Sequence, residues 1–237
     1  SGSSINLINT KNYPFNQSGQ VNIINQAADI LNSILLKNNI NSKYSINIYF
    51  ENEGSNGPLA SASSSTRQIW VNTYFYEGSY ANRNTNMGYN ESGKPVNAYV
   101  PIMVHEVLHV LNLVGISSRG GNFADYSVDA YRGLYNWNGE NVQTNCLLGY
   151  KRLLKAKAQA QGTTINTENK VWVLMENGGG GGTRMSHFEE STNGDGNPIS
   201  GVTYPYLNNE LMTGYFGGSN EYFTSMSVGA LEDVGFV

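Results

Sequence analysis

The segment from Asn97 to Leu111 constrains the fold of this 237-residue chain more than any other. It is apolar at almost every position, and Pro101 is tolerated in a first helical turn, so the segment predicts a buried helix that begins near this proline. Three polar side chains interrupt it, those of His105, Glu106 and His109. A buried setting for these groups favours a functional site over two core histidines with satisfied hydrogen bonds.

The spacing of the two histidines suits a metal ion. On a helix, residues four apart differ by about 40° around the axis and by about 6 Å along it, so His105 and His109 can face one ion. The chain has only three histidines, and His187 is the third. Neutral imidazole is the commonest protein ligand of zinc, and three such ligands leave a fourth position for water. The sequence therefore predicts one Zn²⁺ ion held by His105, His109 and His187.

Glu106 follows the first histidine and projects beside the open position of such an ion. There it can accept a proton from water and pass one to a leaving amine, which is the work of a general base. The pattern His-Glu-x-x-His on a helix is the signature of zinc metallopeptidases, so we expect a zinc endopeptidase that acts on protein or peptide substrates.

A glutamate could replace His187 as the third ligand in a related peptidase design. Glu140, Glu168 and Glu176 are available, but none lies on an obvious helix shortly after the histidine pair. A histidine ligand fits better. Another alternative is a non-catalytic surface binding or adhesion module with structural zinc, against which Glu106 argues because a structural site needs no base.

Composition excludes several other classes. The net charge is −4, which gives no basic field for nucleic acid, and no apolar run approaches the roughly 20 residues that span a bilayer. Cys146 is the single cysteine, so no internal disulfide forms, and we interpret it as a small buried residue. Low charge and many Asn, Ser, Gly and Tyr residues favour a secreted or cell-surface protein, which we expect to be a monomer. Asp195 could bind an ion, leaving calcium open, but a polar turn is the simpler interpretation.

Hydrophobic periodicity predicts the remaining elements. Besides the buried helix, we expect helices over residues 21–36, 127–135, 145–160 and 225–233. We expect strands over residues 45–50, 67–76 and 170–175, and a polar, exposed excursion over 78–94.

Four segments of the chain share the pattern of one family: Tyr99 to Leu111, Met175 to Glu189, Glu210 to Met212, and Gly229 to Phe236. Together they resemble the leishmanolysin-like metzincins, zinc peptidases in which a long insertion separates the third histidine from the helical pair. The last segment is similar to the Leu-Glu-Asp-x-Gly-aromatic ending of their catalytic domain. The likeness is faint between residues 115 and 170.

The resemblance implies roles for further residues. It makes the three histidines the zinc ligands and Glu106 the base, and it places Met212 in a Met-turn as the hydrophobic floor of the site. The run from Gly178 to Gly182 reads as a linker by composition, but in this family it would let the chain double back and deliver His187.

One departure from the family concerns the end of the active-site helix. Asn112 stands where the family usually has a glycine that turns the chain. Asparagine visits the left-handed region more readily than other non-glycine residues, so the turn remains possible, or the helix continues to Gly115.

We therefore expect an α+β, metzincin-type, two-lobed fold that forms one catalytic domain. Residues 1–112 would form an N-terminal lobe with a twisted mixed sheet, helices and the active-site helix. Its edge strand, placed near Arg67 to Asn72, would pair with an extended substrate. Residues 113–237 would form a mostly helical and irregular lobe with the insertion, the third zinc ligand, the Met-turn and a terminal helix.

Overall fold

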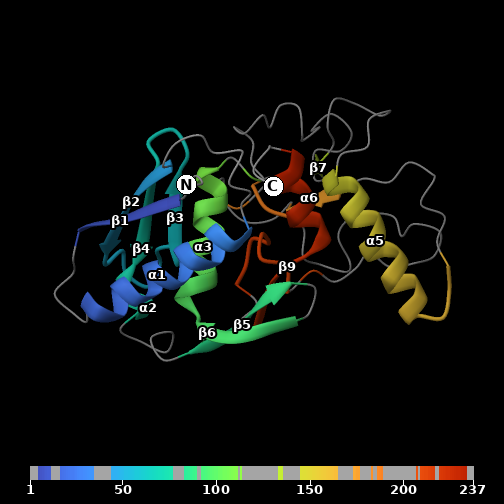
Figure 1. Cartoon of the computed structure of the whole chain (residues 1–237), viewed down its shortest axis with the longest axis horizontal. Helices are drawn as coiled ribbons and strands as arrows, with labels where there is room; N and C mark the ends of the chain where they lie inside the picture. Colours follow the sequence, from blue (N-terminus) through green and yellow to red (C-terminus); the bar gives the residue numbers. More distant parts are fainter. Residues whose placement is uncertain are drawn as a thin grey trace.

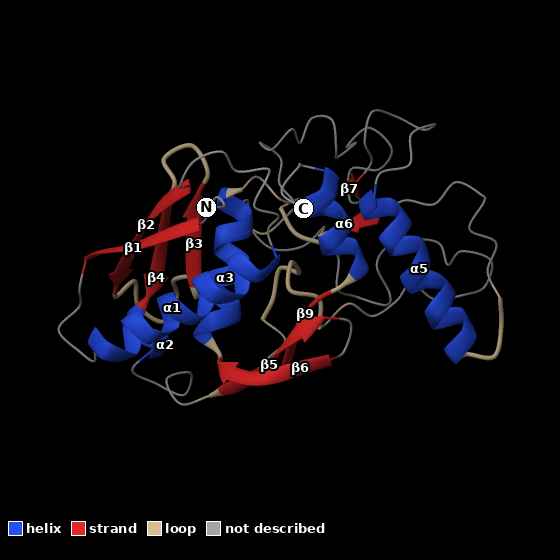
Figure 2. Cartoon of the chain, in the orientation of Figure 1, coloured by secondary structure: helices blue, strands red, loops and turns tan. Residues whose placement is uncertain are grey.

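The structure, a computed structural model, places part of the chain well enough to describe. The described residues are 5–11, 17–34, 44–76, 83–89, 92–111, 113, 133–135, 145–164, 173–176, 183, 186–188, 207, 209–216 and 219–233. They form a mixed α+β fold with open sheets (Figures 1 and 2), which confirms the predicted class.

A four-stranded mixed sheet forms from the first part of the chain. Its strands are β1 (Ile5–Lys11), β2 (Tyr44–Glu51), β3 (Ala60–Ser63) and β4 (Gln68–Asn72), in the order β1-β2-β4-β3. β1, β2 and β4 run parallel, and β3 runs antiparallel to β4. Ile46, Ile48 and Phe50 alternate along β2 and are fully buried, as the predicted strand over residues 45–50 requires.

A strand forms near Arg67 to Asn72 as predicted, but the prediction that it lies at the edge of the sheet was wrong. β4 bonds to β2 on one side and to β3 on the other, so it has no free edge. Its apolar residues Ile69 and Val71 are almost completely buried, as in a central strand. The edges of this sheet are β1 and β3, and the Ala-Ser sequence of β3 carries no strand signal of its own. The strand predicted over residues 67–76 was also too long, since β4 ends at Asn72 and the short helix α2 (Thr73–Tyr76) follows.

Two long helices pack beside this sheet. In α1 (Gln17–Ile34) the residues Ile23, Ile24, Ala27 and Leu31 are buried at helical spacing, which confirms the amphipathic helix predicted from residue 21. α3 (Tyr99–Val110) lies beside α1 and against β3 (Figure 1). The predicted buried helix is therefore confirmed, and it ends at Val110, before Gly115.

A second sheet joins distant parts of the chain. The hairpin of β5 (Asn84–Tyr89) and β6 (Ser92–Asn97) pairs through β5 with β9 (Asn220–Phe223), which runs parallel to β5. The excursion predicted over residues 78–94 is mostly exposed where the structure describes it, but the prediction missed these two strands. Only Thr85 and Met87 of β5 are buried, so its polar composition hid the strand.

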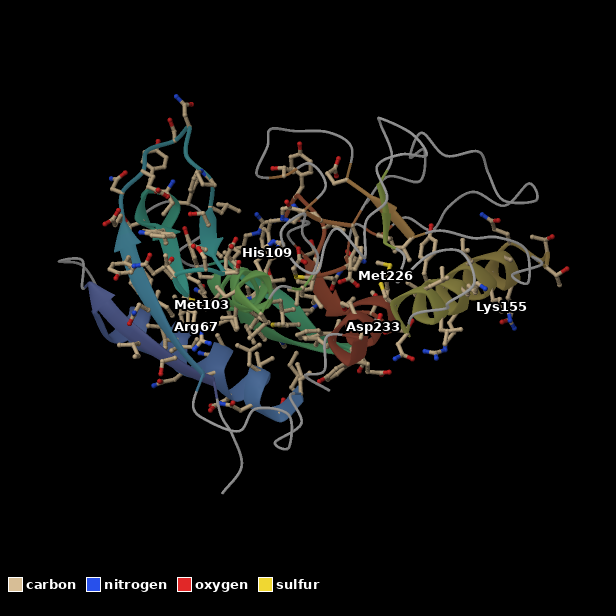
Figure 3. All side chains as sticks on the ribbon, turned by 90° about the horizontal axis from the view of Figure 1, so that it is seen from above. Arg67, Met103, His109, Lys155, Met226 and Asp233 are labelled. Atoms are coloured by element: carbon tan, nitrogen blue, oxygen red, sulfur yellow. The ribbon has the colours of Figure 1, made fainter. Side chains whose placement is uncertain are left out.

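The later part of the chain contributes α5 (Asn145–Ala160) and α6 (Ser225–Asp233), which pack against each other on the far side of α3 from the four-stranded sheet (Figures 1 and 3). Both helices match their predicted ranges. β7 (Gly133–Tyr135) pairs with β8 (Val173–Met175). β8 confirms the strand predicted over residues 170–175. β7 contradicts the helix predicted over residues 127–135 at the last three of those positions.

One continuous hydrophobic core connects these elements. It includes Leu31 of α1, Ile48 of β2, Val104 of α3, Cys146 of α5 and Leu231 of α6. Cys146 is a buried free thiol, as interpreted from the sequence, and burial raises its pKa well above the usual value. The division of the chain into two lobes, residues 1–112 and 113–237, remains a prediction. β9, from the second of these ranges, joins β5, from the first, in one sheet. Within the described residues, no helix is long and apolar enough to cross a bilayer.

Candidate metal centre

α3 presents its two histidines on the only part of its surface that is not buried. Ten of its twelve residues are buried, and the two exceptions are His105 and His109. The side-chain oxygen of Asn97 accepts a hydrogen bond from the Tyr99 amide at 2.9 Å and so caps the start of the helix. The Leu113 amide donates to the Leu108 carbonyl at 2.9 Å and closes its end. Asn112, the expected turn residue, lies outside the described residues.

His187 comes to this surface from a distant segment. The Glu176 amide at the end of β8 donates to the His187 carbonyl at 2.8 Å, and the Phe188 amide donates to the Met212 carbonyl at 2.9 Å. These two bonds hold the histidine between β8 and the segment that contains Met212. The glycine run from Gly178 to Gly182 lies outside the described residues, so its predicted role stays a prediction.

The three imidazoles converge on one point. The Nε2 atoms of His105 and His109 are 3.0 Å apart, those of His109 and His187 are 3.1 Å apart, and those of His105 and His187 are 3.2 Å apart. Among the described residues, these histidines form the group that could hold a metal ion. The sequence-based prediction that all three histidines meet is thus confirmed. Figure 3 shows the position of one of them, His109, on α3.

Backbone carbonyls fix the protons of two of these rings. His105 Nδ1 lies 2.7 Å from the Leu211 carbonyl oxygen, and His187 Nδ1 lies 2.9 Å from that of Thr183. A carbonyl oxygen only accepts, so each Nδ1 must carry the proton and donate it. The Nε2 atoms of both neutral rings then hold bare lone pairs.

These lone pairs face each other without a proton between them. The 3.2 Å between His105 Nε2 and His187 Nε2 has the length of a hydrogen bond, but both atoms are acceptors. Two partial negative charges at this distance repel, and a cation between them would turn the repulsion into attraction. His109 Nε2, which lies 3.0 and 3.1 Å from the other two, has at most one proton to donate, so hydrogen bonding within the cluster leaves at least one nitrogen without a donor. One cation would satisfy all three nitrogens, and the arrangement therefore has the chemistry of a metal site.

The distances also fit a zinc ion. Zinc binds imidazole nitrogen at about 2.0–2.1 Å, so two such ligands in a tetrahedral site are about 3.3 Å apart. The observed separations of 3.0 to 3.2 Å are close to that value. One ion can therefore bind all three nitrogens with little movement of the rings.

Burial keeps the rings in the form that binds metals. Burial, with the neighbouring His187, lowers the pKa of His105 to about 3, and burial lowers the pKa of His187 as well. Both imidazoles are neutral at physiological pH, so a metal ion has no proton to displace from Nε2.

Glu106 lies next to His105 on α3 and is 8 % exposed. Burial raises the pKa of its carboxyl group to about 8 in the protein without metal. A divalent cation bound nearby would lower that pKa, because an adjacent positive charge favours the carboxylate.

Met212 is completely buried in the segment that holds His105 and His187. Its carbonyl accepts from Phe188, and the preceding Leu211 carbonyl accepts from His105. The Met-turn role expected of Met212 stays a prediction. Tyr215, three residues after Met212, is 57 % exposed.

The glutamates considered as alternative third ligands do not join the cluster within the described residues. Glu140 and Glu168 lie outside that part of the chain. Glu176 is buried, and its backbone amide donates a hydrogen bond to the His187 carbonyl, but its side chain is not part of the ligand group.

Sequence reasoning missed the groups that orient the ligands. The carbonyls of Leu211 and Thr183 carry no side-chain signal, and a backbone acceptor can belong to any residue type. Glu210 was visible in the Glu210 to Met212 motif, but its hydrogen bonds to Thr224 and to Ser227 of α6 are revealed only by the fold.

Comparison of the chain with models of known protein families, with curated proteins and with solved structures finds no match. The assignment of a function therefore depends on the geometry of the site and on the sequence motif.

Proposed function

We propose that this chain is a zinc-dependent endopeptidase with a single catalytic ion held by His105, His109 and His187. The observation that supports it most strongly is the convergence of three imidazoles, of which His105 and His187 present bare Nε2 lone pairs. Three imidazole ligands favour zinc among the biological metals, and they match the catalytic rather than the closed structural type of site.

When bound at such a site, zinc acts as a Lewis acid that makes hydroxide available near neutral pH and polarises a carbonyl. The work of the protein is to supply the proton path and the orientation. Glu106 accepts a proton from the attacking water through its carboxylate and returns a proton to the leaving amine. His105 and His187 keep their Nδ1 protons on backbone carbonyls throughout, so their rings do not turn during the reaction.

β3 is the strand that we propose as the docking edge for the substrate. It forms one edge of the four-stranded sheet and packs against α3, which carries the histidine pair. An extended peptide could pair with this edge through its backbone, and so reach the metal centre with its scissile bond held in place. This replaces the earlier expectation for residues 67–72, because β4 is paired on both sides.

The resemblance to leishmanolysin-like metzincins supports the same proposal, since the residues that carry the likeness include all three histidines, Glu106 and Met212. Within it, Met212 forms the hydrophobic floor of the site. We also propose an extracellular setting and protein or peptide substrates.

The test is the substitution Glu106→Ala. We expect the variant to keep one zinc per chain and the wild-type fold, and to lose about 10²-fold or more of its peptidase activity, because general base catalysis is removed. Metal analysis, circular dichroism and digestion of casein or a peptide library measure these three properties. Glu232→Ala, which changes an exposed glutamate of α6, is the matched control and should digest like the wild type.

Undiminished digestion by Glu106→Ala would refute the role of this glutamate. A wild-type protein that binds zinc tightly but hydrolyses no peptide, whether or not the metal chelator 1,10-phenanthroline is present, would instead support a structural zinc module.

A further inference from the structure

Glu210 is a buried carboxylate that belongs neither to the metal ligands nor to the His-Glu-x-x-His motif. It is only 1 % exposed, and it lies two residues before Met212. Burial raises the pKa of its carboxyl group to about 7, which shows how costly a charge is at this position. Such a group requires a structural or functional reason to be there.

The carboxylate of Glu210 joins two elements. Its Oε1 accepts from the Met212 amide at 3.0 Å. Its Oε2 accepts from the Thr224 amide at 3.2 Å, from the Thr224 hydroxyl, and from the Ser227 hydroxyl at 3.4 Å. One oxygen therefore holds the turn that contains Met212, and the other holds the beginning of α6.

The residue inside that turn is the one that orients a metal ligand. Leu211 stands between Glu210 and Met212, and its carbonyl accepts the Nδ1 proton of His105 at 2.7 Å. The Leu211 amide is itself bound, to the Tyr222 carbonyl of β9 at 2.9 Å. The peptide unit that follows Leu211 is held by Glu210, since its amide is that of Met212.

We propose that Glu210 is a positioning residue for the ligand His105. Its carboxylate fixes the amide of the same peptide group whose carbonyl receives the Nδ1 proton of His105. The start of α6 thereby sets the tautomer and the ring orientation of a metal ligand on α3. The inference rests on the metal centre of the proposed function, but not on peptide hydrolysis.

Removal of the Glu210 carboxylate should weaken metal binding. Partners that orient a metal-bound histidine typically change affinity by about 10- to 100-fold when they are lost. We expect a loss in this range for Glu210→Ala. Glu210→Gln keeps the shape and one acceptor oxygen for the Met212 amide, so its affinity should lie between those of Glu210→Ala and the wild type.

The experiment measures the metal directly, without an activity assay. The dissociation constant for Zn²⁺ is obtained by competition with a chromophoric chelator, and the visible spectrum of the Co²⁺-loaded protein reports the ligand geometry. We expect the Co²⁺ bands of Glu210→Ala to shift or lose intensity, and those of Glu210→Gln to resemble the wild type more closely.

Asp233→Ala is the matched control. Asp233 is a partly buried carboxylate at the other end of α6, and it accepts from the amides of Asn145 and Cys146 at 2.8 and 2.9 Å. Its loss should lower the melting temperature of the protein, but leave the zinc affinity within about twofold and the Co²⁺ spectrum unchanged, because within the described residues its hydrogen bonds run to α5 and not to the turn that holds His105.

Wild-type zinc affinity and an unchanged Co²⁺ spectrum in folded Glu210→Ala would overturn the inference, as would an equal loss of affinity in Asp233→Ala. If Glu210→Ala does not fold, Thr224→Val and Ser227→Ala remove single donors, and unchanged affinity in both would overturn it too. A wild type that binds zinc but cleaves no peptide would refute only the peptidase proposal.

Discussion

At the scale of single residues, the metal centre is organised by backbone carbonyls. Leu211 and Thr183 each accept an Nδ1 proton, so the tautomers of His105 and His187 are set by the protein itself. The metal then meets ligands that are already neutral and oriented, which lowers the cost of ordering them. The histidines were readable from sequence because imidazole is rare in this chain, whereas their carbonyl partners were not.

Gly214 offers a test of this organisation at the third ligand. A Cβ atom at this position would lie 2.8 Å from Thr183 Cγ2 and 3.6 Å from Glu176 Oε2. Gly214→Ala should therefore push Thr183 away and disturb the carbonyl that holds His187. We expect zinc affinity to fall by roughly 10-fold, in the range for lost ligand-orienting partners. Competition with a chelator measures the change.

Gly162→Ala provides the comparison, since a Cβ there meets no atom within 4 Å, although its φ of +72° makes the substitution mildly strained. It should cost some stability and leave zinc affinity unchanged. Equal zinc affinity in Gly214→Ala and the wild type would show that Thr183 can move without releasing His187.

At the scale of elements, the sequence found the four long helices and the strands β2, β4 and β8, and it missed β3 and β5. α1, α5 and α6 each bury one face, which gives a repeat near 3.6 residues, whereas α3 was recognised because it is apolar at almost every position. β3 has only alanine and serine, and β5 buries two residues among polar ones, so neither shows a usable alternation.

The remaining errors have the same cause. Whether a strand is central or at an edge depends on which strands pair with it, and β9 pairs with β5 across most of the chain length. Such long-range pairing leaves no local pattern. The central position of β4 was therefore invisible until β3 was seen beside it.

The contact of α5 with α6 predicts that replacing a helical glycine by alanine will destabilise the protein, the opposite of the usual effect. Alanine in place of glycine within a helix normally stabilises it by about 0.5–1 kcal/mol. At Gly149, however, a Cβ atom would overlap the Ser225 carbonyl at the start of α6. We expect Gly149→Ala to lower the free energy of unfolding by about 1–3 kcal/mol, as overpacking does.

Thermal or urea unfolding of Gly149→Ala measures this effect. Ala156→Gly, at an exposed position of the same helix, should cost only about 1 kcal/mol through helix propensity. A Gly149→Ala protein as stable as the wild type would mean that the two helices can separate without loss.

At the scale of the whole molecule, the metal centre draws together segments that are far apart in the chain. α3 supplies two ligands and the segment around His187 supplies the third. The turn from Glu210 to Met212 is hydrogen-bonded to Tyr222 of β9 and to Ser227 of α6. These segments share one hydrophobic core. A bound ion would add a further link between them, so we expect metal to raise the stability of the entire fold.

The central claim is that three imidazoles share one zinc ion, and zinc X-ray absorption spectroscopy tests it most directly. For the purified protein, we predict one zinc per chain with three imidazole ligands at about 2.0–2.1 Å. His187→Ala should lose one of these imidazoles and bind zinc much more weakly. A wild-type protein that binds no zinc, or a His187→Ala spectrum identical to that of the wild type, would contradict the account.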